Sequence, residues 1–190
     1  MPGKELLMVF PTYNEEGALP EVVEEWMPIA RQVNGDMLFV DDGSSDRTPE
    51  ILQTPSQVYP EILFMRHPNR GHGQTCWVGY RYAVAEGYPW VFQTDSDGQT
   101  QPQDFGKFWA CKDQADFIFG ARSERGEGPV RVLISRVLRI VIYATLGVWI
   151  IDANVPYRLM KVAPLAKVLP HIPQQMYLAN AFLTVLNQNA

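Results

Sequence analysis

The stretch "DMLFVDDGSSDRTPE", residues 36–50, contains the pattern that decides the fold. An apolar run ends abruptly in two adjacent carboxylates, Asp41 and Asp42, and Gly43 then permits a tight turn. Thr48 followed by a proline is typical of a helix start. The stretch therefore predicts a buried strand, an acidic turn at its carboxyl end and the beginning of a helix.

The same alternation of short apolar runs and helix-length segments extends over most of the chain. Near-continuous apolar runs predict strands at residues 6–11, 36–42, 61–66, 90–95 and 116–122. Helical patterns follow at residues 20–33, from residue 48 onward, at 73–85 and at 102–112. Such alternation predicts an α/β fold with a mostly parallel central sheet and helices on both faces. Beyond residue 122 we expect a glycine-rich loop, one long helix over about 129–147, a strand-like piece at 152–162 and one or two final helices.

The composition bounds the class of protein. With 190 residues, 46% of them apolar and 19% charged, the chain is expected to form a single globular domain over residues 1–190. A formal charge of −5 gives no overall attraction to nucleic acid. No secretory signal pattern is visible, and the longest apolar stretch, Ile140 to Ile151, is shorter than the roughly 20 residues that span a bilayer. These features favour a cytoplasmic protein.

Polar residues gather where the predicted strands end, which is where open parallel sheets bind ligands. In "TDSDGQT", an extended segment would point Asp95 and Asp97 to one side, and Gln99 would continue that register. Three oxygen ligands on one side suit Mg²⁺ or Mn²⁺ together with a substrate diphosphate. The alternative is a turn and helix cap ahead of Pro102 with solvated carboxylates. A second acidic pair at another strand end favours the metal site.

That second pair has a different expected partner. A carboxylate at Asp41 or Asp42 can accept hydrogen bonds from the N–H groups of a nucleobase or from ribose hydroxyls. A helix start accounts for Gly43 and Thr48, but not for two adjacent carboxylates directly after an apolar run.

The glycines at positions 71 and 73 do not complete a dinucleotide-binding fingerprint. Cys76 occupies the third glycine position, and the lysine of a phosphate-binding P-loop is absent. His72, between the glycines, is either close to a ligand or simply solvated.

Five motifs, in order, resemble glycosyltransferase family 2: "FPTYNEEGALP", "VDDGSSDRT", "HPNRGHGQT", "TDSDGQTQP" and "GARSER". The resemblance covers about residues 7–158 and is strongest to the dolichyl- and polyprenyl-phosphate sugar transferases. It implies the GT-A nucleotide-sugar-binding fold and transfer of a sugar, with inversion at the anomeric carbon, from a UDP- or GDP-sugar donor. The implied acceptor is a polyprenyl phosphate of the dolichyl or undecaprenyl type.

The resemblance also implies roles for individual residues of the donor site. Pro11, Tyr13 and Glu15 fall where the family surrounds the nucleobase, and Asp42 falls where it contacts base or ribose. Ser96 fits the small residue that the family has between its two aspartates. The expected donor site therefore comprises Pro11, Tyr13, Glu15, Asp41, Asp42, Asp95 and Ser96, and the expected Mg²⁺ or Mn²⁺ ligands are Asp95, Asp97 and Gln99.

The acceptor side is expected after residue 120. Arg122, and Arg131 with Ser135, match positions that hold the acceptor phosphate in the polyprenyl-phosphate enzymes, although "GEGP" shortens the loop before Arg131. Arg131, Ser135 and Arg139 form one polar stripe on the predicted 129–147 helix. This helix either lies at the cytoplasmic face of a membrane, in peripheral contact with lipid, or packs in the core with its arginines reaching solvent. Relatives continue into further segments, so we expect a catalytic core without its membrane anchor.

The candidate catalytic residues are Asp97, Arg122, Arg131 and Asp152. An acceptor phosphate is already anionic and needs no general base. A hydroxyl acceptor would need one, for which Asp152 is the candidate, although a cap or an ion pair with Arg158 explains it equally well. A glycan or other hydroxyl acceptor is therefore the first alternative.

Two alternatives come from other classes of protein. A nucleotidyltransferase would be expected to carry a basic, glycine-rich loop after the first strand, where "PTYNEEG" is acidic. A non-catalytic binding module would not need carboxylates at several strand ends. The Q-x-x-R-W signature of processive synthases is absent, which favours single transfer.

Overall fold

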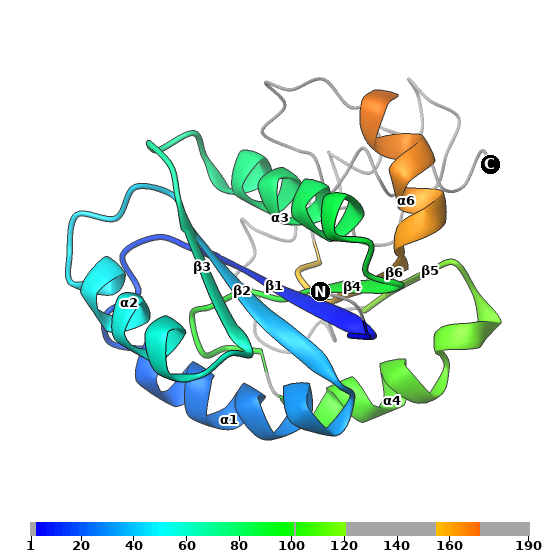
Figure 1. The fold of residues 1–190 in the computed structure, drawn as a ribbon, viewed down its shortest axis with the longest axis horizontal. Coiled ribbons are helices and arrows are strands. Elements are labelled where there is room, and N and C mark those ends of the chain that lie inside the picture. The colour runs from blue at the N-terminus through cyan, green and yellow to red at the C-terminus, as the bar shows by residue number, and fades with distance from the viewer. Residues whose placement is uncertain (1–2, 101, 121–154, 172–190) are drawn as a thin grey trace, which may run out of the picture.

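The computed structural model describes residues 3–100, 102–120 and 155–171, which form one sheet between two layers of helices (Figure 1). The six described strands lie in the order β3-β2-β1-β4-β6-β5. Their bounds are β1 Leu6–Thr12, β2 Gly35–Asp41, β3 Ile62–Arg66, β4 Trp90–Gln93, β5 Phe117–Phe119 and β6 Arg158–Lys161. The pairs β1–β2, β1–β4 and β2–β3 are parallel, whereas β6 runs antiparallel to both of its neighbours. The predicted α/β fold with a mostly parallel sheet is confirmed.

Helices cover both faces of the sheet. Helices α3 and α6 lie on one face, and α1, α2 and α4 lie on the other (Figure 1). Their bounds are α1 Leu19–Gln32, α2 Thr48–Val58, α3 His72–Glu86, α4 Phe105–Ala110 and α6 Val162–Val168. The helix expected over 102–112 is interrupted: 3-10 turns at Pro102–Asp104 and Lys112–Gln114 flank the short α4.

The central strands are continuously apolar because each of their faces packs against helices. Every residue of β1 and β2 is buried. Alternate side chains of β1 enter two separate cores: Phe10 packs with Trp26 of α1, and Val9 belongs to the core that contains Tyr80 of α3. This is the pattern expected of a parallel sheet covered on both faces.

The outer strands depart from the sequence prediction. Strand β3 is one of the two edge strands of the described sheet, and Met65 on it is exposed, so its apolar run is not a buried strand throughout. The strand-like piece over 152–162 becomes β6, which inserts between β4 and β5. Strand β4 ends at Gln93, two residues earlier than expected.

Close packing of α3 against β1 positions the edge of the sheet where the site lies. A Cβ atom built at Gly79 would lie 2.3 Å from Cγ1 of Val9, so only glycine allows this approach. The first turn of α3, from His72, thereby lies near the carboxyl end of β1.

The helix expected over 129–147 lies outside the described residues. Within the described ranges, no helix combines the length and the apolar character needed to cross a bilayer.

Candidate active site

A cavity of about 360 Å³ opens at the carboxyl end of the sheet. Its walls come from the ends of β1, β2 and β4 and from the first turn of α3. Strand β1 has β2 on one side and β4 on the other, so the cavity lies at the point where the strand order reverses. Open α/β sheets bind ligands at such a point. The lining residues are Pro11, Thr12, Tyr13, Glu15, Asp42, Asn69, Gly71, His72, Thr75, Asp95, Ser96 and Asp97.

The loops after β1 and β2 are joined to each other by hydrogen bonds. The backbone N–H of Asn14 donates to Oγ of Ser44, and that of Glu15 donates to Oγ1 of Thr48, both at 2.9 Å. In return, the N–H of Ser45 donates to Oδ1 of Asn14 at 2.9 Å. Asn14 adopts a left-handed conformation, with φ at 55°, which asparagine tolerates better than most residues. The polar residues of the two motifs thus build a fixed wall for the cavity.

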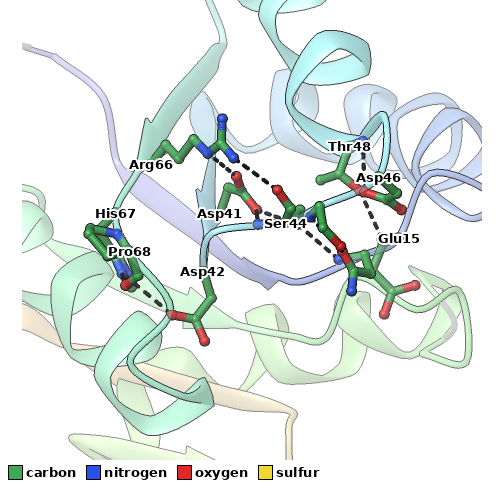
Figure 2. Close-up of polar contacts among 11 residues, drawn as sticks. Glu15, Asp41, Asp42, Ser44, Asp46, Thr48, Arg66, His67 and Pro68 are labelled. Carbon is green, nitrogen blue, oxygen red and sulfur yellow. Dashed lines mark hydrogen bonds and ion pairs between the residues drawn. The ribbon is translucent and has the colours of Figure 1, made fainter.

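Asp41 is engaged entirely by groups of the protein (Figure 2). Its side chain is fully buried, Oδ2 lies 3.0 Å from Nε of Arg66, and Oδ1 accepts hydrogen bonds from the N–H and hydroxyl of Ser44. Nη2 of Arg66 also donates to the Ser44 carbonyl at 2.9 Å. Asp41 does not line the cavity. These contacts show that Asp41 holds the turn after β2. The expected contact of Asp41 with the nucleotide stays a prediction.

Asp42 lines the cavity and also fixes the loop before α3. Its two carboxylate oxygens accept the N–H groups of Arg70 at 2.7 Å and Gly71 at 2.9 Å. Nδ1 of His67 lies 3.5 Å from Oδ1 (Figure 2). Gly71 has φ at 88°, a conformation that favours glycine, and it is the residue from which α3 begins. The carboxylate of Asp42 therefore determines where the first turn of α3 meets the cavity.

The acidic segment after β4 does not have the extended shape that the sequence analysis assumed. The chain turns at Gly98, with φ at 73°, and the N–H of Gln99 donates to Oδ1 of Asp97 at 2.9 Å. Gln99 consequently leaves the register of the two aspartates and does not line the cavity, whereas Asp95 and Asp97 do. The turn that was considered as an alternative is present, and it coexists with two carboxylates on the cavity wall.

Negative charge accumulates on this wall. Burial and the charges of Asp97, Asp46 and Asp95 raise the pKa of Glu15 above its usual value. His72, in the first turn of α3, is half exposed, with Nε2 3.9 Å from Oδ1 of Asp95. Carboxylate oxygens gathered in this way are the donors that Mg²⁺ and Mn²⁺ prefer, so the residues present fit such an ion.

The protein alone does not supply a complete set of metal ligands. Among the described residues, no three His, Cys, Asp or Glu side chains converge on one point. Mg²⁺ commonly binds through one or two carboxylates, with substrate phosphates and water completing its shell. Asp95 and Asp97 meet that requirement, and the remaining ligands would come from a bound substrate.

Buried polar side chains that the sequence did not predict lie at the end of β4, where Gln93 pairs with Arg158 of β6. The hydroxyl of Tyr80 donates to Oε1 of Gln93 at 3.3 Å, and burial raises the pKa of this hydroxyl well above its usual value. Arg158 is fully buried; its Nε donates to the Val155 carbonyl at 2.8 Å, and its guanidinium lies 4.7 Å from the Phe119 ring centroid. The available signal was a glutamine and an arginine at the ends of otherwise apolar strands.

The remaining predicted site residues divide into two groups. Pro11, Tyr13 and Ser96 line the cavity as expected for the donor site, together with Glu15. Arg122, Arg131, Ser135 and Asp152 lie outside the described residues, so their assignments stay predictions. Thr12, Asn69, Gly71 and Thr75 also line the cavity; they were not predicted as site residues, although each lies within one of the five motifs. His72, which was expected either close to a ligand or in solvent, lines the cavity too.

The profile of the family described as "Glycosyl transferase family 2" matches residues 8–168, which include the carboxyl ends of β1, β2 and β4 at the cavity. The chain belongs to glycosyltransferase family 2. The expected family is therefore confirmed.

Two curated relatives show which branch of glycosyltransferase family 2 the chain is similar to. An undecaprenyl-phosphate 4-deoxy-4-formamido-L-arabinose transferase of Pectobacterium carotovorum is 30% identical over 150 residues, which are 76% of this chain and 45% of the relative. A polyprenol monophosphomannose synthase of Mycolicibacterium smegmatis is 28% identical over 176 residues, which are 88% of this chain and 65% of the relative. The chain spans about half the length of the first of these relatives. Both names contain a polyprenyl-phosphate substrate or product, as the sequence resemblance implied.

A solved structure confirms the fold. The glucosyl-3-phosphoglycerate synthase of Mycobacterium tuberculosis, crystallised with Mn²⁺ and UDP-glucose, matches with a TM-score of 0.61 at 18% identity. The match covers 85% of this chain and 57% of that one. At this identity the likeness concerns the fold alone, which is the GT-A arrangement that the sequence resemblance implied.

Proposed function

We propose that this chain is an inverting, metal-dependent glycosyltransferase that moves a sugar from a nucleotide-sugar donor to a polyprenyl phosphate. The observation that carries the proposal is the cavity at the strand-order reversal, where Glu15, Asp95 and Asp97 concentrate negative charge beside the first turn of α3. The names of the two curated relatives supply the acceptor class.

The donor nucleotide would occupy the wall formed by the ends of β1 and β2. Pro11 and Tyr13 line that wall, and the Tyr13 side chain is half exposed, so its ring is accessible to a base. Asp42 has both oxygens engaged by N–H donors, but each oxygen has two acceptor positions, so it retains capacity for a base or ribose donor. Because Asn14, Ser44 and Ser45 join the two loops, this wall is formed before the nucleotide arrives.

The diphosphate of the donor would lie toward the end of β4. Asp95 and Asp97 would hold Mg²⁺ or Mn²⁺, and Gln99 stays a candidate ligand that would have to move toward the cavity. When bound, the ion supplies neutralisation of the charge that develops on the departing diphosphate. The two carboxylates would fix the position of the ion, and the turn at Gly98 follows them at the cavity wall.

The acceptor would approach from the side of Arg122 and Arg131, with Ser135, by the family resemblance. Two arginines suit a phosphate because the guanidinium donates paired, charge-assisted hydrogen bonds. They would place the phosphate oxygen in line behind the anomeric carbon, which converts an encounter into a positioned attack. The acceptor is already anionic, so Asp152 would not be needed as a general base.

A polyprenyl acceptor requires contact with a membrane. We propose that this contact is peripheral, at the cytoplasmic face, through the apolar side of the segment 130–149. An interfacial segment with a cationic stripe should bind anionic lipid more tightly at low salt, because charge attraction is screened over about 10 Å at 0.1 M ionic strength.

The test is a transfer assay that offers UDP- and GDP-sugars with Mn²⁺ and, in parallel, a short polyprenyl phosphate and a free sugar as acceptors. We expect transfer to the polyprenyl phosphate, and we expect Arg122→Ala and Arg131→Ala each to reduce it strongly. Arg31→Ala, on the exposed end of α1, is the matched control and should retain full transfer. Transfer to the free sugar that is unaffected by Arg122→Ala and by Arg131→Ala would defeat the lipid-phosphate acceptor and leave the glycosyltransferase assignment in place.

A second candidate function is transfer to a small hydroxyl acceptor. It is the alternative that the sequence leaves open, because the residues of the described cavity concern the donor side and do not distinguish between acceptors. In that case Asp152 would serve as the general base, and Asp152→Asn would abolish transfer to the hydroxyl acceptor in the same assay.

A further inference from the structure

Two threonine hydroxyls close the acidic segment after β4 upon itself. Oγ1 of Thr94 donates to Oγ1 of Thr100 at 2.8 Å, and Oγ1 of Thr100 donates in turn to the backbone carbonyl of Asp95 at 3.3 Å. The two directions are compatible, because each hydroxyl donates once. The pair Thr94 and Thr100, here named the hydroxyl clip, therefore joins the two ends of the loop that carries Asp95 and Asp97.

The clip is anchored to the rigid part of the sheet. Thr94 is fully buried, and its backbone N–H donates to the Val9 carbonyl of β1 at 3.2 Å. Thr100 is half-buried and lies at the far side of the turn at Gly98. The hydroxyl at the far end of the loop is thus bonded to a hydroxyl that the central strands hold in place.

The rest of the loop is held at its middle. Oγ of Ser96 donates to the Pro11 carbonyl at 2.9 Å, which fastens the residue between the two aspartates to the end of β1. The N–H of Gln99 caps Asp97. With the clip in place, Asp95 lies between two residues with defined hydrogen bonds, Thr94 and Ser96, and Asp97 lies between Ser96 and the turn at Gly98.

This arrangement opposes a specific force. Asp95 and Asp97 lie with Glu15 on one wall, and their charges contribute to the raised pKa of Glu15, so like charges repel across the loop opening. A loop without the clip would relieve that repulsion by moving its carboxylates apart toward solvent. A cation would then have to draw them together again, and that cost would be subtracted from its binding free energy.

We propose that Thr94 and Thr100 are positioning residues that hold Asp95 and Asp97 in the geometry that a divalent cation and a diphosphate need. The inference rests on the proposed function, because it presumes that these carboxylates bind a cation. Neither hydroxyl is proposed as a ligand of the cation, because both act through the loop that they close.

The test compares Thr100→Val, which removes the hydroxyl with almost no change of shape, with Thr100→Ser, which keeps it. The readout is the Kd of Mn²⁺ measured by calorimetry in the presence of saturating UDP or GDP, whichever the wild-type protein binds. Loss of a partner that orients metal ligands typically costs about 10-fold or more in metal affinity, so Thr100→Val should weaken Mn²⁺ binding by about 10-fold and Thr100→Ser by less than about 3-fold. Thr54→Val, an exposed threonine of α2, is the control and should bind Mn²⁺ like the wild type.

A double variant shows whether the two threonine hydroxyls act together or independently. Thr94→Val should weaken Mn²⁺ binding to a similar extent, and the double variant should be no weaker than either single variant, because the two hydroxyls act as one unit. Additive losses would overturn the clip. Wild-type Mn²⁺ affinity in Thr100→Val, or an equal loss in Thr100→Ser, would also overturn it.

The two proposals fail in different ways. If the wild-type protein binds neither UDP nor GDP with Mn²⁺ present, the proposed function fails and the clip fails with it. If the wild type binds them and both valine variants bind Mn²⁺ equally well, the clip alone is wrong.

Discussion

The carboxylates at the end of β2 and those at the end of β4 follow similar apolar strands, but they have different surroundings. After β2, Asp41 is paired with Arg66 and bonded to Ser44, and Asp42 accepts two backbone N–H groups. After β4, Asp95 and Asp97 lie on the cavity wall with Glu15, whose pKa is raised by burial and by their charges. The first pair serves mainly to hold loops, and the second pair leaves negative charge facing the cavity. A carboxylate at a strand end can therefore hold a loop or face a ligand, and the hydrogen-bond donors around it show which of the two it does.

The largest expected effect is that of removing a carboxylate after β4. Asp97→Asn should reduce sugar transfer by about 1,000-fold, equivalent to about 4 kcal/mol of transition-state stabilisation, because it removes a ligand charge next to the diphosphate. The melting temperature should stay near the wild-type value, because no core contact is lost. Turnover at limiting and saturating Mn²⁺ measures the effect.

The control for that substitution is Asp104→Asn, an exposed carboxylate a few residues later that pairs with Lys107 on the surface. It should leave turnover unchanged. Near-normal turnover of Asp97→Asn at limiting Mn²⁺ would show that the carboxylates after β4 do not bind the ion.

The second largest effect is expected from removing a carboxylate after β2. Asp41→Asn should lower the free energy of unfolding by about 2 kcal/mol, because it weakens charge-assisted hydrogen bonds to a buried carboxylate. The change in nucleotide affinity should be much smaller than the change in stability. Urea unfolding and UDP or GDP calorimetry on the same preparation give both numbers. A stable variant that has lost nucleotide affinity would place Asp41 in the ligand site and remove the contrast between the two strand ends.

The smallest expected effect concerns the charge of Glu15 on the cavity wall. The raised pKa of Glu15 means that the folded state binds a proton more tightly than the unfolded chain, whose glutamate titrates near 4.5. Glu15 therefore costs stability at pH 7, and this cost disappears as the pH falls below that ordinary value. Glu15→Gln should raise stability at pH 7 by less than about 1 kcal/mol, because the group is partly exposed, and should change nothing near pH 3.

Thermal unfolding of wild type and Glu15→Gln at pH 3 and pH 7 measures this difference. Glu16→Gln, which removes a neighbouring exposed carboxylate that pairs with Arg47, is the matched control. A gain of the same size in both variants would mean that general surface charge, and not the cavity cluster, is responsible.

The parallel part of the fold was predictable from sequence, because residues such as Val9 and Phe10 must be apolar when both faces of a strand are covered. The place of β6 was not. Its sequence contains Arg158, whose burial depends on neighbours far away in the chain, and a four-residue strand gives little periodicity to recognise. The edge position of β3 likewise follows from topology and not from its own apolar run.

The cavity was predictable to the extent that residue types mark strand ends. Tyr13, Asp42, Asp95 and Asp97 were expected there and line it. Gln99 does not line the cavity, because a spacing of two predicts one side only while the backbone stays extended, and the chain turns at Gly98; its role as a ligand stays a prediction. That Asp41 faces inward to Arg66 could not be read from sequence, since Arg66 is 25 positions away.

The central claim is that the carboxylates after β4 bind a divalent cation together with the diphosphate of a nucleotide. Calorimetric titration of UDP and of GDP into the wild-type protein, with and without Mn²⁺, tests it most directly. The account predicts that at least one of the two nucleotides binds, that Mn²⁺ tightens its binding by about 10-fold or more, and that Asp97→Asn removes this tightening. Failure of both nucleotides to bind with Mn²⁺ present, or tightening that survives in Asp97→Asn, would contradict it.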